Sequence, residues 1–147
     1  MLRYLEDLVI GARFSCGGFS FTREEIIDFA RKFDPQPFHL DEEAARQTYF
    51  QGLSASGIHT QAMALGLVVR ALTDIAVVAG GSLDQAKFFK PVRPDLPYNV
   101  VAWWHEARPS ASNPTRGVAA VRGEARDSGG DLVMTFGVTY VLARRPA

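Results

Sequence analysis

The feature that most constrains this chain is an apolar run over residues 57–79, near the middle of its 147 residues. Apolar side chains occupy nearly every side of the helix that this run predicts, and a helix without a polar face is a buried one. Ser54 or Ser56 can cap its start, and Gly80-Gly81 predicts its end. We therefore expect one long buried helix, around which the remaining elements are organised.

Other segments show the alternation of apolar and polar side chains that is typical of β-strands. The segments with an extended pattern are residues 13–19, 83–92, 98–104, 121–126 and 132–140. Asp127-Ser128-Gly129-Gly130-Asp131 predicts a hairpin turn between the last two. Such a sheet needs cover for its apolar face, and only the 57–79 helix is long enough. The fold class is therefore α+β, with a curved antiparallel sheet wrapped around a long central helix in a single domain over residues 1–147.

An earlier helix is predicted from a capping box. The Thr22 hydroxyl can accept the amide proton of Glu25, whose carboxylate can reach back to the Thr22 amide. Apolar residues then recur at helical spacing as far as Phe33. Because Pro35 disfavours helical geometry in the residue before it, this helix should end near Asp34.

A second short helix is expected over residues 41–48. The segment between it and the first helix carries the clearest chemical signal. Asp34 and His39 lie five residues apart in what we expect to be a loop, which Pro35 and Pro37 stiffen. A carboxylate and an imidazole can activate water and move protons near neutral pH. The alternative is that Asp34 caps a turn and His39 is only a packed side chain.

A second candidate segment leads into the long helix. The first amides of a helix are free to bind an oxyanion or polarise a carbonyl, and Gly57 would allow a ligand to approach closely. The simpler interpretation is a helix capped by Ser56 with a glycine at a tight point. Ser56 is not favoured as a nucleophile, since the Gly-x-Ser-x-Gly pattern is missing around it.

Together, the two segments resemble the MaoC-like acyl dehydratases, also called (R)-specific enoyl-CoA hydratases. The hydratase motif of that family, Asp-x-Asn-Pro-x-His-x-Asp, is matched in spacing by Asp34, Pro37, His39 and Asp41. Gln36 stands where the motif has Asn. The resemblance covers most of the chain and implies a hot-dog fold, which agrees with the sheet and helix expected from the residue pattern.

The resemblance implies the reversible addition of water to a 2-enoyl-CoA thioester, with Asp34 and His39 as the catalytic pair. Gln36, Ser56 and Gly57 would bind substrate, with the Gly57 amide facing the thioester carbonyl. Many family members have His where Ser56 stands. No metal and no cofactor is implied, since CoA is part of the substrate. Two alternatives stay open: an acyl-CoA thioesterase of the hot-dog superfamily, or a non-catalytic acyl-CoA-binding protein in which Gln36 and Ser56 mark a lost activity.

Composition and charge limit the classes of binding partner and the cellular compartment that we expect. Lys and Arg number 16, as do Asp and Glu, so a formal net charge of zero does not favour nucleic acid or an anionic membrane surface. Cys16 is the single cysteine, which excludes an intrachain disulfide framework. Charged residues near the N-terminus would interrupt the apolar core of a signal peptide. The longest apolar or glycine run, residues 62–69, is too short to span a bilayer. We expect a cytoplasmic protein.

The expected sheet also predicts self-association. A single sheet on one helix leaves an edge strand uncovered, and the resemblance implies two copies paired edge to edge, so we expect at least a homodimer.

Of the remaining polar residues, His59 and His105 are interpreted as structural. Lys87, Lys90 and Arg93 could meet CoA phosphates, although basic residues at a strand end are more often just solvated.

Overall fold

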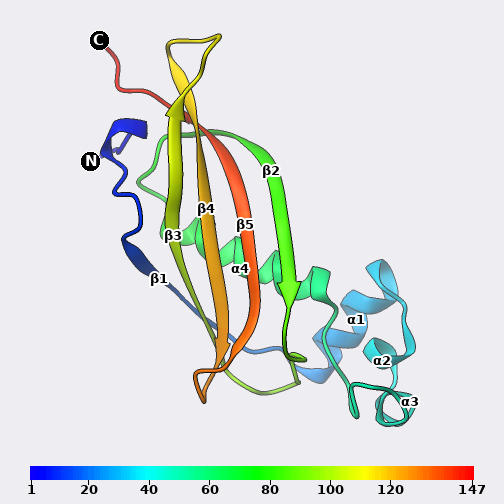
Figure 1. Ribbon diagram of the computed structural model, residues 1–147. Helices are drawn as coiled ribbons and strands as arrows, with labels where there is room; N and C mark the ends of the chain where they lie inside the picture. The colour runs from blue at the N-terminus through cyan, green and yellow to red at the C-terminus, as the bar shows by residue number, and fades with distance from the viewer.

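The alternating segments form five antiparallel strands in the computed structural model, which describes residues 1–147. The strands are β1 (Arg13–Phe19), β2 (Val77–Phe88), β3 (Tyr98–Pro109), β4 (Arg116–Asp127) and β5 (Leu132–Ala143). They form one sheet in the order β1-β3-β4-β5-β2, so that β1 and β2 are its edges. The sheet curves across helix α4, and the termini lie together at one end of the strands (Figure 1). The predicted α+β class is confirmed.

Helices α1, α2 and α3 gather at the opposite end of the sheet, whereas η1 lies beside the N-terminus (Figure 1). The helical elements are η1 (Leu5–Asp7), α1 (Arg23–Phe33), α2 (Pro37–Leu40), α3 (Glu42–Arg46) and α4 (Gly57–Ala71). The capping box is present: the Glu25 amide donates to Thr22 Oγ1 at 3.1 Å, and the Thr22 amide donates to Glu25 Oε2 at 3.0 Å. α1 ends at Phe33 and Asp34 is its C-cap, as Pro35 predicts.

The long helix is shorter than its sequence predicts. α4 ends at Ala71 rather than Ala79, and Gly80-Gly81 lies inside strand β2 instead of ending a helix. The turn between the two elements is fixed by the N-terminal segment, since Arg3 pairs with Asp74 at 2.7 Å. The β-branched pair Val77-Val78 favours an extended backbone, and β2 gains a hydrogen-bonded partner in β5.

Two further expectations differ from the structure. Strand β2 begins before residue 83 and ends at Phe88 rather than Val92. The segment expected to be a loop contains one helical turn, α2. Pro37 stands at its first position, where proline is well tolerated because the first amides of a helix have no intrahelical partner.

The core lies between α4 and the inner face of the sheet. α4 packs against β1 and β3, and its fully buried residues are Thr60, Ala64 and Val68. Ile58 and Val69 on the same helix are exposed, so the helix is not buried on every side. None of the helices has the length and apolar character that crossing a membrane requires.

Candidate active site

The carboxylate of Asp34 stands at the C-terminal end of α1. The Asp34 amide donates to the carbonyl of Ala30 at 2.9 Å, which closes the last turn of the helix. Pro35 then prevents the helix from continuing, and the Gln36 amide donates back to the Asp34 carbonyl at 2.8 Å. This tight reversal leaves the Asp34 side chain with 17% of its surface exposed.

His39 lies on the single turn of α2 and is almost fully buried, with 5% exposed. Its Nδ1 atom lies 2.5 Å from the Ser54 carbonyl oxygen, an acceptor only. Nδ1 must therefore carry the proton, and in the neutral imidazole Nε2 holds the lone pair. Nε2 lies 3.3 Å from Asp34 Oδ2, so the atom that can accept a proton points at the carboxylate.

Two more side chains converge on the same carboxylate. Ser56 Oγ donates to Asp34 Oδ2 at 2.7 Å, and Gln36 Nε2 donates to Asp34 Oδ1 at 2.8 Å. Burial raises the pKa of Asp34, but the two hydrogen bonds lower it, as does the positive charge of His39 when that ring is protonated, and together they outweigh burial. The net pKa of Asp34 is lowered, so the carboxylate is ionised at neutral pH.

The start of α4 contributes a free backbone amide. Ser56 is the N-cap, and its Oγ accepts the Ile58 amide at 3.2 Å, while the Gly57 amide donates to no protein acceptor in residues 1–147. A Cβ at Gly57 would lie 2.6 Å from Cζ of Phe88, so only glycine fits beside that ring in this arrangement. Ser56 is fully buried and already bonded on both sides, which agrees with a capping role rather than a nucleophilic one.

These groups face a mostly apolar cavity of about 510 Å³. Its lining includes Asp34, Gln36, His39 and Gly57, four of the five candidate residues named from the sequence, whereas Ser56 is not among its lining residues. Its remaining lining includes Phe38, Tyr49, Phe50, Ile58, Phe88 and Phe89. The aromatic lining was not predicted, because no local pattern shows that residues 49–50 and 88–89 meet. The Ser54 carbonyl was missed because every residue has one.

Two other polar candidates, His59 and Lys90, make no hydrogen bond or ion pair with Asp34 or His39. His59 is stacked between Phe21 and Phe29, at 3.9 and 4.3 Å between ring centroids, and burial lowers its pKa. Lys90 lines the cavity but pairs with Asp127 and Asp131. No group of three or more His, Cys, Asp or Glu side chains is arranged to hold a metal ion.

Comparisons with known proteins identify a family and agree with the fold. Residues 14–122 match the sequence model of the MaoC like domain. The crystal structure of a MaoC-like dehydratase from Rhodospirillum rubrum is 35% identical, covers 99% of both chains and has a TM-score of 0.88. The (R)-hydratase from A. caviae involved in PHA biosynthesis, 20% identical over 96% of this chain and 99% of its own, shares the fold with a TM-score of 0.74.

A curated relative has no assigned activity. The uncharacterized protein YdeM of Bacillus subtilis (strain 168) is 36% identical over 92 residues, which is 62% of this chain. The chain matches 65% of the length of that relative.

Proposed function

This chain belongs to the family of MaoC-like domains, and we propose that it is a hydro-lyase that adds water reversibly to a 2-enoyl thioester. The observation that carries the proposal is the contact of 3.3 Å between His39 Nε2 and Asp34 Oδ2 beside an apolar cavity. Members of the family are named dehydratases and (R)-hydratases, which act on this type of bond.

The pair supplies the proton transfers. A water molecule that contacts both Asp34 and His39 from the cavity side loses one proton to the pair while its oxygen forms a bond to C3 of the substrate. The C2=C3 π electrons move towards the thioester carbonyl, and the pair returns a proton to C2. The lowered pKa of Asp34 supports its role, since the carboxylate is ionised and able to hold the water at neutral pH.

The start of α4 stabilises the charge that develops on the thioester oxygen. The Gly57 amide has no other acceptor and lies at the positive end of the helix dipole. One preorganised donor of this kind typically contributes about 3–4 kcal/mol to the stability of the transition state. Asp34, His39 and Gly57 all line the same cavity, which supports a single reacting centre.

The substrate is an acyl-CoA thioester in this proposal. The apolar cavity lining suits an acyl chain, and the thiol carrier extends towards solvent. CoA arrives with the substrate, so the reaction uses no separate cofactor. The zero net charge of the chain gives no reason to include nucleic acid among its partners.

A second copy of the chain completes the proposal. Edge strand β2 exposes Val77, Val78, Leu83 and Phe88, and these residues together with Phe89 and Ile58 form what we call the β2 edge surface. Phe88, Phe89 and Ile58 also line the cavity. A partner that covers the β2 edge surface therefore covers the cavity as well, and we propose a homodimer with its active sites at the interface.

Hydration of enoyl-CoA substrates of different chain length and branching tests this function. The measurement is the loss of the absorbance of the conjugated thioester, with purified wild-type protein and the Asp34→Asn variant. We expect hydration of at least one substrate by the wild type and a loss of about 10²–10⁴-fold in the variant.

The same samples separate the alternatives. Release of free thiol without loss of the double bond would identify a thioesterase. Tight binding of the thioester without turnover would identify a binding protein. Either outcome, or unimpaired hydration by folded Asp34→Asn protein, would overturn the proposal.

A further inference from the structure

The loop between α3 and α4 supports both halves of the candidate site. It supplies the Ser54 carbonyl that accepts the His39 proton, and it ends at Ser56, which bonds Asp34. Two backbone bonds hold it in place: the Ser54 amide donates to the Phe38 carbonyl at 3.0 Å, and the Ala55 amide donates to the Val92 carbonyl at 2.9 Å. The orientation of the Ser54 carbonyl is therefore a property of this loop and of its neighbours.

The guanidinium of Arg93 also holds this loop, through hydrogen bonds to two of its backbone carbonyls. Its Nη1 donates to the Leu53 carbonyl at 3.2 Å, and its Nη2 donates to the Phe50 carbonyl. No carboxylate pairs with this guanidinium. Gly52 lies between the two carbonyls in sequence, and a Cβ there would stand 3.1 Å from Nη1, so glycine lets the guanidinium approach the backbone.

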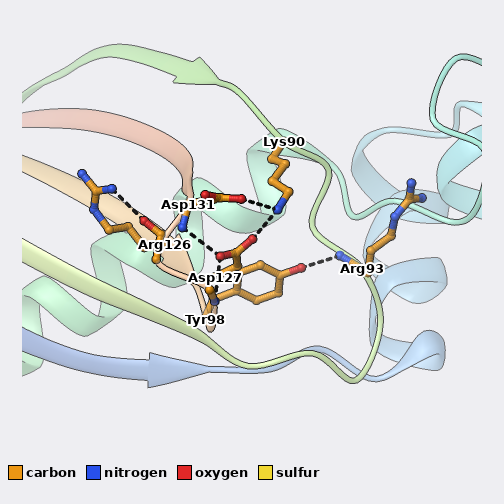
Figure 2. A network of polar contacts seen from close by, with 8 residues as sticks. Lys90, Arg93, Tyr98, Arg126, Asp127 and Asp131 are labelled. Atoms are coloured by element: carbon orange, nitrogen blue, oxygen red, sulfur yellow. Dashed lines mark hydrogen bonds and ion pairs between the residues drawn. The ribbon is translucent and has the colours of Figure 1, made fainter.

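The backbone that carries Arg93 is itself anchored. The Arg93 amide donates to Tyr98 Oη at 2.9 Å, as Figure 2 shows. Tyr98 is 2% exposed in the core. Nearby, Lys90 pairs with Asp127 and Asp131 of the β4–β5 hairpin at 2.5 and 3.0 Å (Figure 2). The guanidinium thus projects from a segment that is tied to the sheet at two points.

We propose that Arg93 is a positioning residue for the catalytic pair. By fixing the carbonyls of Phe50 and Leu53, it sets the direction of the next peptide and of the Ser54 carbonyl. That carbonyl holds the proton on His39 Nδ1, which leaves Nε2 free to accept a proton beside Asp34. This inference rests on the proposed function for its kinetic consequence, although the effect on the His39 ring is independent of it.

The geometry requires a guanidinium rather than any cation. Two carbonyls are engaged by two nitrogens of one planar fork. A lysine ammonium is a point donor on a flexible stem and cannot hold both carbonyls in this fixed arrangement. Arg93→Lys therefore keeps the charge and removes the clamp. Arg126→Lys is the matched control, because Arg126 also donates to a carbonyl, that of Gly130 at 2.9 Å, but in the β4–β5 hairpin.

The experiment measures the His39 ring and the kinetics in the same variants. The Nδ1 proton resonance is assigned by its absence from His39→Ala, and kcat, KM and the melting temperature are determined beside it. In Arg93→Lys we expect this resonance to shift or broaden, and kcat to fall by about 10- to 100-fold while KM changes less. Arg126→Lys should match the wild type in every measurement.

A folded Arg93→Lys protein with an unchanged His39 resonance overturns the proposal. If Arg93→Lys does not fold, Arg93→Gln decides, since its single amide nitrogen cannot engage both carbonyls as the two guanidinium nitrogens do; an unchanged resonance there also overturns the proposal. A wild type that hydrates no thioester disproves the proposed function alone, because the resonance still reports whether Arg93 holds the ring.

Discussion

At the scale of single residues, one carboxylate organises the site. Asp34 accepts hydrogen bonds from Ser56 and Gln36 and faces His39, so the short segment of residues 34–39 meets the start of α4 at this carboxylate. The bonds to Ser56 and Gln36 stabilise the ionised carboxylate against the cost of its burial. Ser56 also caps α4, so the residue that starts the helix also orients the carboxylate.

We predict that Asp34 and His39 act as a unit. If both hold one water, removing either side chain already removes the function of the other, so the effects on rate do not add. Asp34→Asn and His39→Ala should each reduce kcat by about 10²–10⁴-fold. The double variant should be little slower than either single one. A double variant whose loss equals the product of the single losses would show that the two residues act independently.

A second prediction concerns Gln36 and pH. Gln36→Ala removes a hydrogen bond that lowers the pKa of Asp34, so this pKa should rise towards its ordinary value. The ionised form is then lost at a higher pH, and the acid limb of the pH–rate profile should move to higher pH. Gln47→Ala, at an exposed glutamine, is the control and should leave the profile unchanged. If the acid limb of Gln36→Ala lies at the same pH as that of the wild type, Gln36 does not influence the pKa of Asp34.

At the scale of elements, close contacts between neighbouring elements explain two glycines. Gly57 at the start of α4 faces the ring of Phe88, which is 54% exposed at the end of β2. Gly123 in β4 faces the ring of Phe136 in β5, which is 2% exposed. An added methyl group would lie 2.6 Å from the first ring and 2.2 Å from the second. Only the exposed ring has room to move aside.

We therefore predict opposite outcomes for two alanine substitutions. Gly57→Ala should keep its free energy of unfolding and lose hydration activity, because the methyl group and the displaced Phe88 ring crowd the proposed carbonyl site. Gly123→Ala should lose about 1–3 kcal/mol of its free energy of unfolding, the usual cost of overpacking a core. Urea denaturation together with the hydration assay measures both. Equal stability of the two variants would contradict this account.

At the scale of the whole molecule, the protein leaves an apolar edge uncovered. The β2 edge surface lies on one side of the cavity, and the unpaired backbone of β2 adds hydrogen-bonding groups to it. The chain has no net charge to oppose the association of two copies. The proposed homodimer would bury this edge, including the exposed side chains of Val77, Val78 and Leu83.

The corresponding prediction is tested by a charge on that surface. Leu83→Asp places a carboxylate at an exposed apolar position of β2, so burying it against a second copy is unfavourable. Light scattering at micromolar concentration should show a dimer for the wild type and a monomer for the variant, with loss of hydration activity. Val9→Asp, at an equally exposed residue far from β2 in sequence, should remain dimeric. A monomeric wild type would contradict the proposed assembly.

The local elements and much of the site could be predicted because short-range chemistry decides them. The Thr22 capping box, Pro35 after Asp34 and the hairpin at residues 127–131 act over a few residues, and all three are found where the sequence predicts them. Alternation in β3, β4 and β5 shows which face is buried. Asp34 and His39 could be identified as candidate residues for the same reason, since they belong to one short segment.

Only the tertiary structure decided where the apolar run stops being a helix. The apolar character of residues 77–79 suits a buried helix, while the β-branched side chains of Val77 and Val78 favour a strand, and in the structure this segment pairs with β5. The one-turn helix at α2, the Ser54 carbonyl that fixes the His39 proton and the clamp by Arg93 depend equally on distant segments. Sequence by itself determined the residue types and their local geometry; the contacts that assign each group its partner arise only when separate segments pack together, because hydrogen bonding and burial act through space rather than along the chain.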